Sequence, residues 1–288
     1  MIGRVIKFYN SFFFVKVEEN LIPCKLRGLM KRDKKIGSAV CPGDFVEISL
    51  LKDNSGVIEK VLPRKSLMTR PAVANVDKII LTFAATQPDL HPLLLNKFLV
   101  LAEFSKIKEI IICVNKIDLI ADAENFLSDY ENLYKIVRVS AIEKKNISEL
   151  KKILSSGVNI FAGPSGVGKS SILNAIDENL KLKVGKVSEK ILRGKHTTRI
   201  SELIEFGEGF LVDTPGFSAV DLSQIDKKNL RECFKEFKNF AADCKFLNDC
   251  SHSHEPDCGV KIAVENKKIL RERYESYLSM LKEVEGLK

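Results

Sequence analysis

The chain has 288 residues, of which 45% are hydrophobic and 29% are charged, so it encodes a folded protein of two or three domains rather than a disordered segment. No apolar run approaches the ~18 residues that span a bilayer, and the N-terminus lacks the pattern of a signal peptide, so we expect a soluble protein of the cytoplasm. The net charge is +8, and residues 1–66 hold 13 basic against 7 acidic residues. This local excess favours a polyanionic partner, with a solvated surface as the alternative.

Residues 1–66 combine short β-rich runs with turn residues, a pattern that predicts a small barrel. The size fits an OB-fold, and an SH3-like barrel is the alternative. A predicted basic loop would contact phosphate, and Tyr9, Phe12 and Phe14 would stack on bases where they face outward. Residues 63–71 are expected to form a linker. The predicted strands are residues 4–9, 11–17, 45–50 and 56–61, and the loop contains Lys25, Arg27, Lys31, Arg32, Lys34 and Lys35.

In residues 72–221, apolar runs alternate with helical patterns, which is typical of an α/β domain with a mostly parallel sheet. Ligands of such sheets bind at the carboxyl ends of the strands. Residues 222–288 are predicted to be helical apart from a group of cysteines and histidines, against which an apolar face of the last helix packs. The apolar runs are residues 78–85, 109–114, 135–139 and 158–162, and the helical patterns are residues 92–105, 122–133, 147–154 and 169–177.

A phosphate-binding loop is predicted where the sequence matches G-x-x-x-x-G-K-[ST]. The segment follows a predicted strand and begins a predicted helix, which is the context of a phosphate-binding loop. The alternative, a Gly-rich turn without function, does not explain this context. Backbone N–H groups would hold the phosphates, Lys169 would bridge the β- and γ-phosphates, and Ser170 would hold Mg²⁺. The residues of this loop and of the helix start are Gly163, Pro164, Ser165, Gly166, Val167, Gly168, Lys169, Ser170 and Ser171.

The predicted base site consists of an N-K-x-D motif and a Ser-Ala pair, each directly after a predicted strand. The Asp118 carboxylate can accept both the N1–H and the N2–H₂ of guanine, a pair of donors that adenine does not offer. Asn115 would contact the base edge and support the loop, and the Lys116 stem would cover the base plane. A backbone N–H of the Ser-Ala loop would reach guanine O6. The set is Asn115, Lys116, Ile117, Asp118, Ser140 and Ala141.

Two further segments are expected to respond to the γ-phosphate. The D-x-x-G motif from Asp213 to Gly216 would hold the water shell of Mg²⁺ and sense the phosphate. A threonine of the stretch 193–199 would reach Mg²⁺ only when the γ-phosphate is present, which describes an order–disorder switch. Thr197 and Thr198 are both possible, and we take Thr198 as the candidate ligand.

The order of these motifs is unusual, because the base motifs precede the phosphate loop. The chain in this respect resembles the circularly permuted GTPases, and together with its barrel and its Cys/His group it resembles one family in particular, the ribosome small-subunit-dependent GTPase A (YjeQ/YloQ type). The resemblance covers essentially the whole chain. It implies an OB-fold RNA-binding domain (residues 1–66), a circularly permuted P-loop GTPase domain (72–221) and a C-terminal helical zinc-binding domain (222–288).

For function, the resemblance implies hydrolysis of GTP to GDP and phosphate during late maturation of the small ribosomal subunit, with that subunit and its rRNA as partners. GTP or GDP, Mg²⁺ and one structural Zn²⁺ are the implied ligands. A membrane or DNA partner is not expected, and one complete GTPase site per chain favours a monomer. Two other functions are a non-enzymatic rRNA-binding scaffold that uses GTP as an occupancy signal, and an ATP-dependent kinase with a zinc lid, which Asp118 disfavours.

The residue that positions the attacking water is not obvious from the motifs. Many GTPases have a glutamine directly after D-x-x-G, whereas Phe217 occupies that position here and cannot orient water. The resemblance marks His196 as the candidate, and packing or RNA contact is the alternative role for this side chain. Lys169 and Thr198 complete the predicted catalytic set.

The Cys/His group offers a complete tetrahedral donor set for structural Zn²⁺, with three thiolates and one imidazole. The resemblance implies Cys244, Cys250, His252 and Cys258 as the ligands, although one more residue separates the first two cysteines than in the family pattern. His254 is an alternative ligand. An odd number of cysteines, 7, in a chain without an export signal argues against a disulfide framework.

Overall fold

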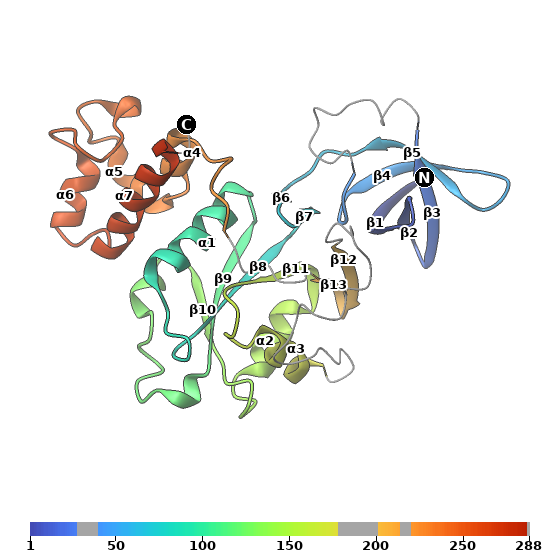
Figure 1. Cartoon of the computed structure of the whole chain (residues 1–288), viewed down its shortest axis with the longest axis horizontal. Coiled ribbons are helices and arrows are strands. Elements are labelled where there is room, and N and C mark those ends of the chain that lie inside the picture. The colour runs from blue at the N-terminus through green and yellow to red at the C-terminus, as the bar shows by residue number, and fades with distance from the viewer. Residues whose placement is uncertain (28–39, 178–200, 214–219, 287–288) are drawn as a thin grey trace.

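The structure is a computed structural model that describes residues 1–27, 40–177, 201–213 and 220–286 (Figure 1). Three parts follow one another along the chain: a β-barrel, a sheet with helices, and a helical region that carries the C-terminus. Among the described helices, none is both long and apolar enough to cross a membrane.

The N-terminal strands form a closed barrel in the order β1-β2-β3-β5-β4, with β1 closing onto β4. All neighbouring pairs are antiparallel except β3 and β5, which run parallel. This is the five-stranded arrangement of an OB-fold, so the predicted fold of this region is confirmed. Valine and isoleucine side chains fill the interior. The strands are β1 (Ile2–Tyr9), β2 (Phe12–Val17), β3 (Asn20–Leu26), β4 (Phe45–Leu50) and β5 (Gly56–Val61).

The expectation that Lys25 belongs to a loop is wrong. Lys25 lies within strand β3, not in a loop, because the strand extends to Leu26 and pairs with β5. Arg27 follows directly and forms an ion pair with Glu59, with 2.6 Å between Nη1 and Oε2. The other four basic residues of the predicted loop lie outside the described residues.

The expected linker at residues 63–71 is instead fixed to the barrel. Arg64 donates two hydrogen bonds, of 2.6 and 2.7 Å, to the buried Asp44 carboxylate. A short hairpin follows, formed by β6 (Leu67–Thr69) and β7 (Ala72–Ala74). The sequence gives no sign of this attachment, because Asp44 lies 20 positions earlier in the chain, in the turn before β4.

The central sheet has six strands in the order β10-β9-β8-β11-β13-β12. The first five run parallel, and only the edge strand β12 is antiparallel to its neighbour. The chain order reverses between β8 and β11, which is where ligands bind in open α/β sheets. The strands are β8 (Lys78–Ala84), β9 (Glu109–Asn115), β10 (Lys135–Arg138), β11 (Ser156–Ala162), β12 (Glu202–Phe206) and β13 (Glu208–Asp213).

Helices cover both faces of this sheet, since successive side chains of β8 are buried in cores on opposite faces. Ile79, Leu81 and Phe83 pack in one core with helix α1, whereas Ile80 belongs to a second core with α2 and α3. Buried on both faces, the parallel strands are apolar along their length. The helices are α1 (Pro92–Phe104), α2 (Ile147–Leu154) and α3 (Lys169–Ile176).

The helix predicted for residues 122–133 is wrong, because this segment forms turns and a single 3-10 turn, η2 (Ser128–Tyr130). Asp122 accepts hydrogen bonds from the backbone and side-chain amides of Asn125, at 3.4 and 3.1 Å. Such local side-chain bonds compete with those of a helix. Leu127 is in the left-handed region, with φ 64°, which interrupts a helix directly.

The C-terminal region is helical, as predicted, and packs on α1 (Figure 1). The expected apolar face of the last helix is present, and it buries Tyr277, Leu281 and Val284 in one core with the cysteine group. This face also buries Arg273. The helices are α4 (Lys227–Glu232), α5 (Lys238–Ala241), α6 (Gly259–Glu265) and α7 (Arg271–Gly286), and the 3-10 turns are η4 (Lys235–Phe237) and η5 (Leu247–Asp249).

Candidate functional site

The nucleotide motifs gather at the carboxyl edge of the parallel sheet. The N-K-x-D motif begins at the last residue of β9, the Ser-Ala pair follows β10, and the glycine-rich loop follows β11. Asp213 is the last residue of β13, the neighbour of β11. Segments that are up to 98 positions apart in sequence thus meet at one edge, because parallel strands end on the same side.

The glycines of the phosphate loop are required by close contacts. Gly163 has φ +141°, and a Cβ atom there would lie 2.0 Å from the Thr82 carbonyl oxygen. Gly168 has φ +93°, and its Cβ would lie 2.3 Å from the Asn115 amide nitrogen. A side chain at either position would push the loop away from the sheet. Helix α3 then starts at Lys169, so Ser170 and Ser171 are in its first turn, next to the loop.

Asn115 joins three of the motifs to one another. Its side chain is buried, and its amide donates to the Val167 carbonyl of the phosphate loop at 2.9 Å. Its side-chain oxygen accepts a 3.1 Å hydrogen bond from the Ala141 backbone N–H. Both ends of the amide are therefore engaged in holding the loops, which fixes the base motif relative to the phosphate loop.

The remaining base-site residues are placed around this junction. Asp118 lies in a 3-10 turn, η1 (Ile117–Leu119), and within the described part of the chain its half-buried carboxylate has no hydrogen-bond partner. The Lys116 ammonium donates to the Gln87 carbonyl, in the loop after β8. Ile117 and Ser140 are buried, and the Ser140 hydroxyl accepts a hydrogen bond from the Glu143 backbone N–H. Sequence reasoning did not identify the Gln87 contact.

Lys169 is held by its own loop. Its ammonium donates to the carbonyl oxygens of Gly163 and Pro164, at 2.7 and 2.6 Å. Burial lowers the pKa of this lysine to about 8, because desolvation disfavours its charged form and its hydrogen-bond partners within the described structure are uncharged carbonyl groups. An anionic phosphate in the loop would supply that missing charge.

The other predicted nucleotide residues are not located by the structure. His196, Thr197 and Thr198 lie outside the described residues, and so do Gly216 and Phe217. For Asp213 the backbone is placed at the end of β13, directly beside the phosphate-loop strand.

The cysteine group is compact enough for a metal ion. One donor atom from each of Cys244, Cys250, His252 and Cys258 lies within 4.8 Å of the others, and all four residues are buried. The sulfur atoms of Cys244 and Cys258 are 3.7 Å apart. A tetrahedral site with Zn–S bonds of about 2.3 Å requires a separation of about 3.8 Å, so the donor set fits zinc. The extra residue after Cys244 does not remove its thiol from the group.

The histidine faces the thiols through Nδ1, which is 3.6 Å from the Cys244 sulfur and 3.4 Å from the Cys258 sulfur. Burial lowers the pKa of His252 to about 4, so the imidazole is neutral and can ligate. Its Nε2 is buried and has no hydrogen-bond partner among the described residues. The alternative ligand His254 is exposed and contacts the Ser253 hydroxyl at 3.0 Å, outside the group.

Three residues that the sequence did not single out as site residues support the cysteine loop. Glu255 accepts hydrogen bonds from the backbone amides of Ser251 and Ser253, at 2.7 and 3.0 Å. From helix α7, the Tyr274 hydroxyl donates to the His252 carbonyl at 2.8 Å, and Tyr277 donates to that of Ser251. The loop that carries two of the donors is therefore fixed by its own glutamate and by the last helix.

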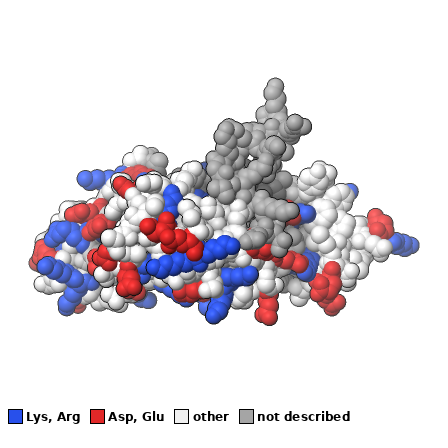
Figure 2. Space-filling model, turned by 90° about the horizontal axis from the view of Figure 1, so that it is seen from below, with Lys and Arg blue, Asp and Glu red and all other residues white. Residues whose placement is uncertain are grey.

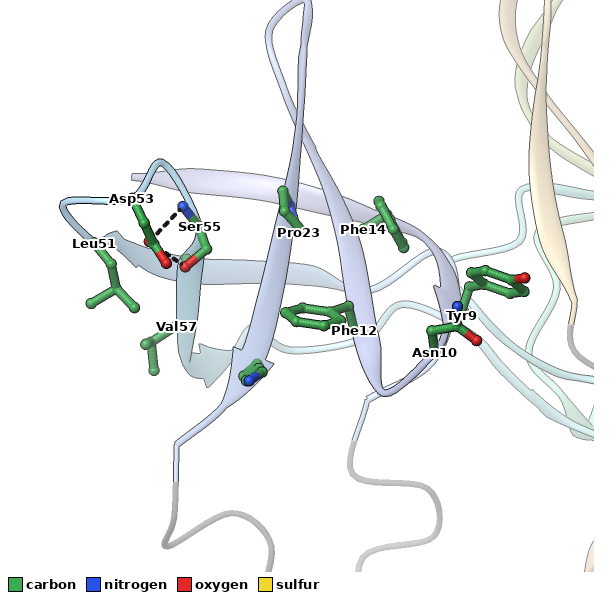
Figure 3. Close-up of a pocket in the computed structure, with 11 residues that line it drawn as sticks. Tyr9, Asn10, Phe12, Phe14, Pro23, Leu51, Asp53, Ser55 and Val57 are labelled. Atoms are coloured by element: carbon green, nitrogen blue, oxygen red, sulfur yellow. Dashed lines mark hydrogen bonds between the residues drawn. The ribbon is translucent and has the colours of Figure 1, made fainter.

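The barrel has an aromatic outer face (Figure 3). Phe12 and Phe14 line a hollow of about 650 Å³ together with Pro23 and Val57, whereas the intervening Phe13 packs on the barrel core. The Lys25 ammonium lies 4.8 Å from the centre of the Phe12 ring, and Tyr9 borders the same hollow. Aromatic rings interleaved with cations form the kind of surface on which single-stranded nucleic acid stacks.

Charge elsewhere is mixed. On the face shown in Figure 2, basic and acidic side chains alternate, and the coloured residues form no large area of one sign. This face therefore offers no large positive area to a polyanion, whereas the barrel face groups Lys25 with aromatic rings.

Comparison with known proteins gives the same result over the whole chain. The family model RsgA GTPase matches residues 61–223, and the RsgA N-terminal domain model matches residues 2–58. Relatives named small ribosomal subunit biogenesis GTPase RsgA include one from Clostridium botulinum, 43% identical over 99% of this chain and 97% of its own. One from Caldanaerobacter subterraneus is 43% identical over 98% of this chain and 95% of its own.

Two solved structures are similar throughout. The crystal structure of YjeQ from Thermotoga maritima superimposes with a TM-score of 0.83 at 40% identity, covering 99% of this chain and 98% of that one. YloQ, described as a circularly permuted GTPase, gives a TM-score of 0.80 at 32% identity, covering 100% and 96%. With the motif order and the site geometry described above, these matches establish that the chain belongs to the RsgA GTPase family and is a circularly permuted GTP hydrolase.

Proposed function

We propose that this chain is a GTPase of small ribosomal subunit biogenesis, which hydrolyses GTP to GDP and phosphate and is stimulated by the small subunit. The observation that carries the proposal is the convergence of the guanine motif, the Ser-Ala loop and the phosphate loop at one sheet edge, locked together by Asn115. The relatives at 43% identity over nearly the full length bear the corresponding name. A protein that acts on ribosomal subunits would act in the cytoplasm, and we propose that location for this chain.

In the proposed nucleotide site, Asp118 reads the guanine edge, Lys116 covers the base plane, and the loop of Ser140 and Ala141 faces O6. The backbone of residues 163–168 and the first turn of α3 hold the phosphates, with Lys169 released from its carbonyl partners to bridge them. Mg²⁺, when bound, neutralises charge on the β- and γ-phosphates. Ser170 and Thr198 are its proposed ligands.

Three further residues are proposed to take part in hydrolysis. Asp213 would hold the water shell of Mg²⁺, and Gly216 would sense the γ-phosphate. Phe217 carries no group that can orient water, and the resemblance to the family implies His196 for that role, which we adopt in the proposal. Slow turnover of the isolated protein and acceleration by its partner are the expected consequences.

For the accessory regions, we propose the division at residues 1–66, 72–221 and 222–288. The barrel would bind rRNA through its outer aromatic face, an assignment supported by the outward Phe12 and Phe14 and by the Lys25 cation over the Phe12 ring. Cys244, Cys250, His252 and Cys258 would hold one structural Zn²⁺, which leaves no open coordination position for catalysis. A monomer is proposed, with neither membrane nor DNA as partner.

Cosedimentation tests the partner assignment directly. We expect the protein loaded with a non-hydrolysable GTP analogue to sediment with purified small subunits and to remain in the supernatant with large subunits. The GDP-loaded protein should bind small subunits more weakly, because the γ-phosphate contacts are absent. Equal binding to both subunits, or none to either, would refute the proposed partner.

A further inference from the structure

Lys7 on strand β1 contacts two parts of the molecule at once. Its ammonium lies 5.7 Å from the centre of the Phe14 ring, on the outer aromatic face of the barrel, and Lys7 is paired with Phe14 in the β1–β2 register. The same ammonium donates a 2.7 Å hydrogen bond to the Glu202 carboxylate, the first residue of β12 in the GTPase domain. One lysine therefore connects the aromatic face with the edge strand of the central sheet.

Further contacts around this pair join the barrel to strands β12 and β13 of the sheet, and we call this interface the seam. Lys16 of the barrel forms a second ion pair with Glu205 of β12. The Arg4 guanidinium lies 4.3 Å from the centre of the Phe45 ring in the barrel and 5.4 Å from that of Phe210 in β13. Neither lysine lines the hollow, but Lys7 contacts the Phe14 ring, whereas within the described residues Lys16 has no such contact with an aromatic ring. The Lys16–Glu205 pair is therefore the matched comparison for the Lys7–Glu202 pair.

The pair at the aromatic face is open to exchange. The Lys7 and Glu202 side chains retain 33% and 44% of their exposed area, so a solute anion can reach the ammonium. A partly exposed ion pair contributes little, because water competes for both charges. An RNA strand whose bases stack on Phe12 and Phe14 carries one phosphate for every base. A phosphate oxygen accepts a hydrogen bond from an ammonium group, as a carboxylate oxygen does.

We propose that Lys7 is a phosphate-binding residue for single-stranded RNA, and that Glu202 occupies its ammonium in the free protein as an internal substitute for the phosphate. RNA binding exchanges one acceptor for the other and removes this contact from the seam. By linkage, whatever strengthens the Lys7–Glu202 pair weakens RNA binding, and the reverse. The inference rests on the proposed RNA-binding role of the barrel and adds a specific residue and a competitor to it.

The exchange is tested by a double-mutant cycle on the full-length protein. The probe is a fluorescently labelled oligouridylate of about 12 nucleotides, within the site sizes of OB-folds, titrated at low ionic strength. We expect Glu202→Gln to tighten binding by about two- to fivefold, the range of an exposed ion pair, because the competitor is gone. Lys7→Gln should weaken binding and lower the salt slope of log K by roughly 0.7.

The decisive comparison is Glu202→Gln in the Lys7→Gln background, where the exchange predicts no gain in affinity. Glu205→Gln is the matched control, since it removes the same charge from the same strand and should leave RNA affinity unchanged. Circular dichroism of each variant checks that the fold is retained.

The outcomes separate the inference from the function on which it rests. If Glu202→Gln tightens binding equally with and without Lys7, or if Glu205→Gln does the same, general charge repulsion explains the gain and the exchange is refuted. If Phe12→Ala abolishes binding while Glu202→Gln changes nothing, the barrel binds RNA but the exchange is wrong. If the wild-type protein does not bind the oligonucleotide, both proposals fail.

Discussion

Lys169 illustrates how a single buried charge prepares the nucleotide site. Among the described residues, the Lys169 ammonium donates to the Gly163 and Pro164 carbonyl oxygens, which accept hydrogen bonds but carry no full charge. Burial therefore lowers the pKa of Lys169 to about 8, and the free site holds the proton weakly near neutral pH. A bound phosphate reverses this effect, since its negative charge favours the protonated amine.

Proton uptake on nucleotide binding is the measurable consequence. Because the pKa is lower in the free protein than in the complex, binding GDP at about pH 8 should take up roughly half a proton, and at about pH 6.5 almost none. The affinity should accordingly be constant below pH 7 and fall as the pH rises through 8. Calorimetry in buffers of different ionisation enthalpy measures the uptake, and Lys116→Gln should retain it. Binding at pH 8 without proton uptake would contradict this account of Lys169.

Asp118 has a different role, because its carboxylate has no partner within the described structure and so remains available to the base. Asp118→Asn replaces an acceptor by a donor opposite the guanine amino group. We expect the affinity for GTP to fall roughly 100-fold, for the loss of about 3 kcal/mol of charge-assisted hydrogen bonding. Xanthosine triphosphate, which has a carbonyl in place of that amino group, should bind the variant better than GTP does. Unchanged preference for GTP would show that Asp118 does not read the base.

At the scale of elements, a buried ion pair fixes helix α7 against η4 and α1. Arg273 is fully buried, donates to both Glu236 oxygens at 2.7 and 3.0 Å, and reaches the Asn96 side chain on α1 at 3.1 Å. Asn96 in turn donates to Ser276 on α7 at 2.8 Å. The C-terminal region is therefore joined to the GTPase domain by a satisfied polar network inside an apolar interface.

Arg273→Met should cost about 3–5 kcal/mol of unfolding free energy, because it leaves the Glu236 carboxylate buried without its partner. The double variant Arg273→Met with Glu236→Leu should recover most of that loss. Lys97→Met is the matched control: Lys97 and Glu283 also join α1 to α7, but at the surface, so we expect less than about 1 kcal/mol. Tyrosine fluorescence during urea unfolding reports the change, since Tyr130, Tyr134, Tyr274 and Tyr277 are near this network. If the double variant were no more stable than the single one, the unpaired Glu236 carboxylate would not be the cause of the lost stability.

The cysteine loop should depend on its metal. Burial raises the pKa of the Cys250 thiol, so the thiolate that ligates a metal has to be stabilised by the bound cation. We expect Cys250→Ser to reduce the bound zinc, measured by elemental analysis of the purified protein, from one ion per chain to a small fraction. His254→Ala should leave the zinc content unchanged, because that side chain points away from the group. Loss of zinc from the His254 variant would mean that the fourth donor is misassigned.

Elements defined by local patterns could be predicted from the sequence, and those defined by distant partners could not. The phosphate loop, the parallel strands and the cysteine group each depend on spacing within a few residues. By contrast, β12 could not be recognised, because this edge strand is only five residues long and its sequence, Glu-Leu-Ile-Glu-Phe, shows neither regular alternation nor a long apolar run. The segment 122–133 has helical spacing but is bound by its own Asp122, and the burial of Arg273 depends on Asn96, which lies 177 positions away.

The same distinction applies to the candidate site. Sequence motifs identified Asn115 and Lys169 as site residues. They did not show that the Asn115 amide holds two loops through its nitrogen and its oxygen, or that the Lys169 ammonium donates to carbonyl oxygens of its own loop. Because side chains alternate along a strand, the sequence left two possibilities: either Phe12 and Phe14 face outward, or Phe13 does. The structure shows that Phe12 and Phe14 face outward. The Lys7–Glu202 pair joins residues 195 positions apart and left no local signal.

At the scale of the whole molecule, the GTPase domain lies between two accessory regions that attach at different places. The barrel contacts β12 at one edge of the sheet, and the C-terminal region packs on α1 over one of its faces (Figure 1). Both attachments are made to elements next to the nucleotide edge: β12 pairs with the strand that ends at Asp213, and α1 follows the loop that Lys116 contacts. A partner that binds either region is therefore placed to influence turnover.

If the proposed function is right, the small ribosomal subunit stimulates GTP hydrolysis by this protein. The most direct measurement is the steady-state turnover of GTP and ATP, with purified small subunits, with large subunits and with neither. We predict slow GTP turnover alone, strong stimulation by small subunits only, and no turnover of ATP. Slow GTP turnover that small subunits leave unchanged would contradict the claimed partner, and turnover of ATP would show that the base site is misread.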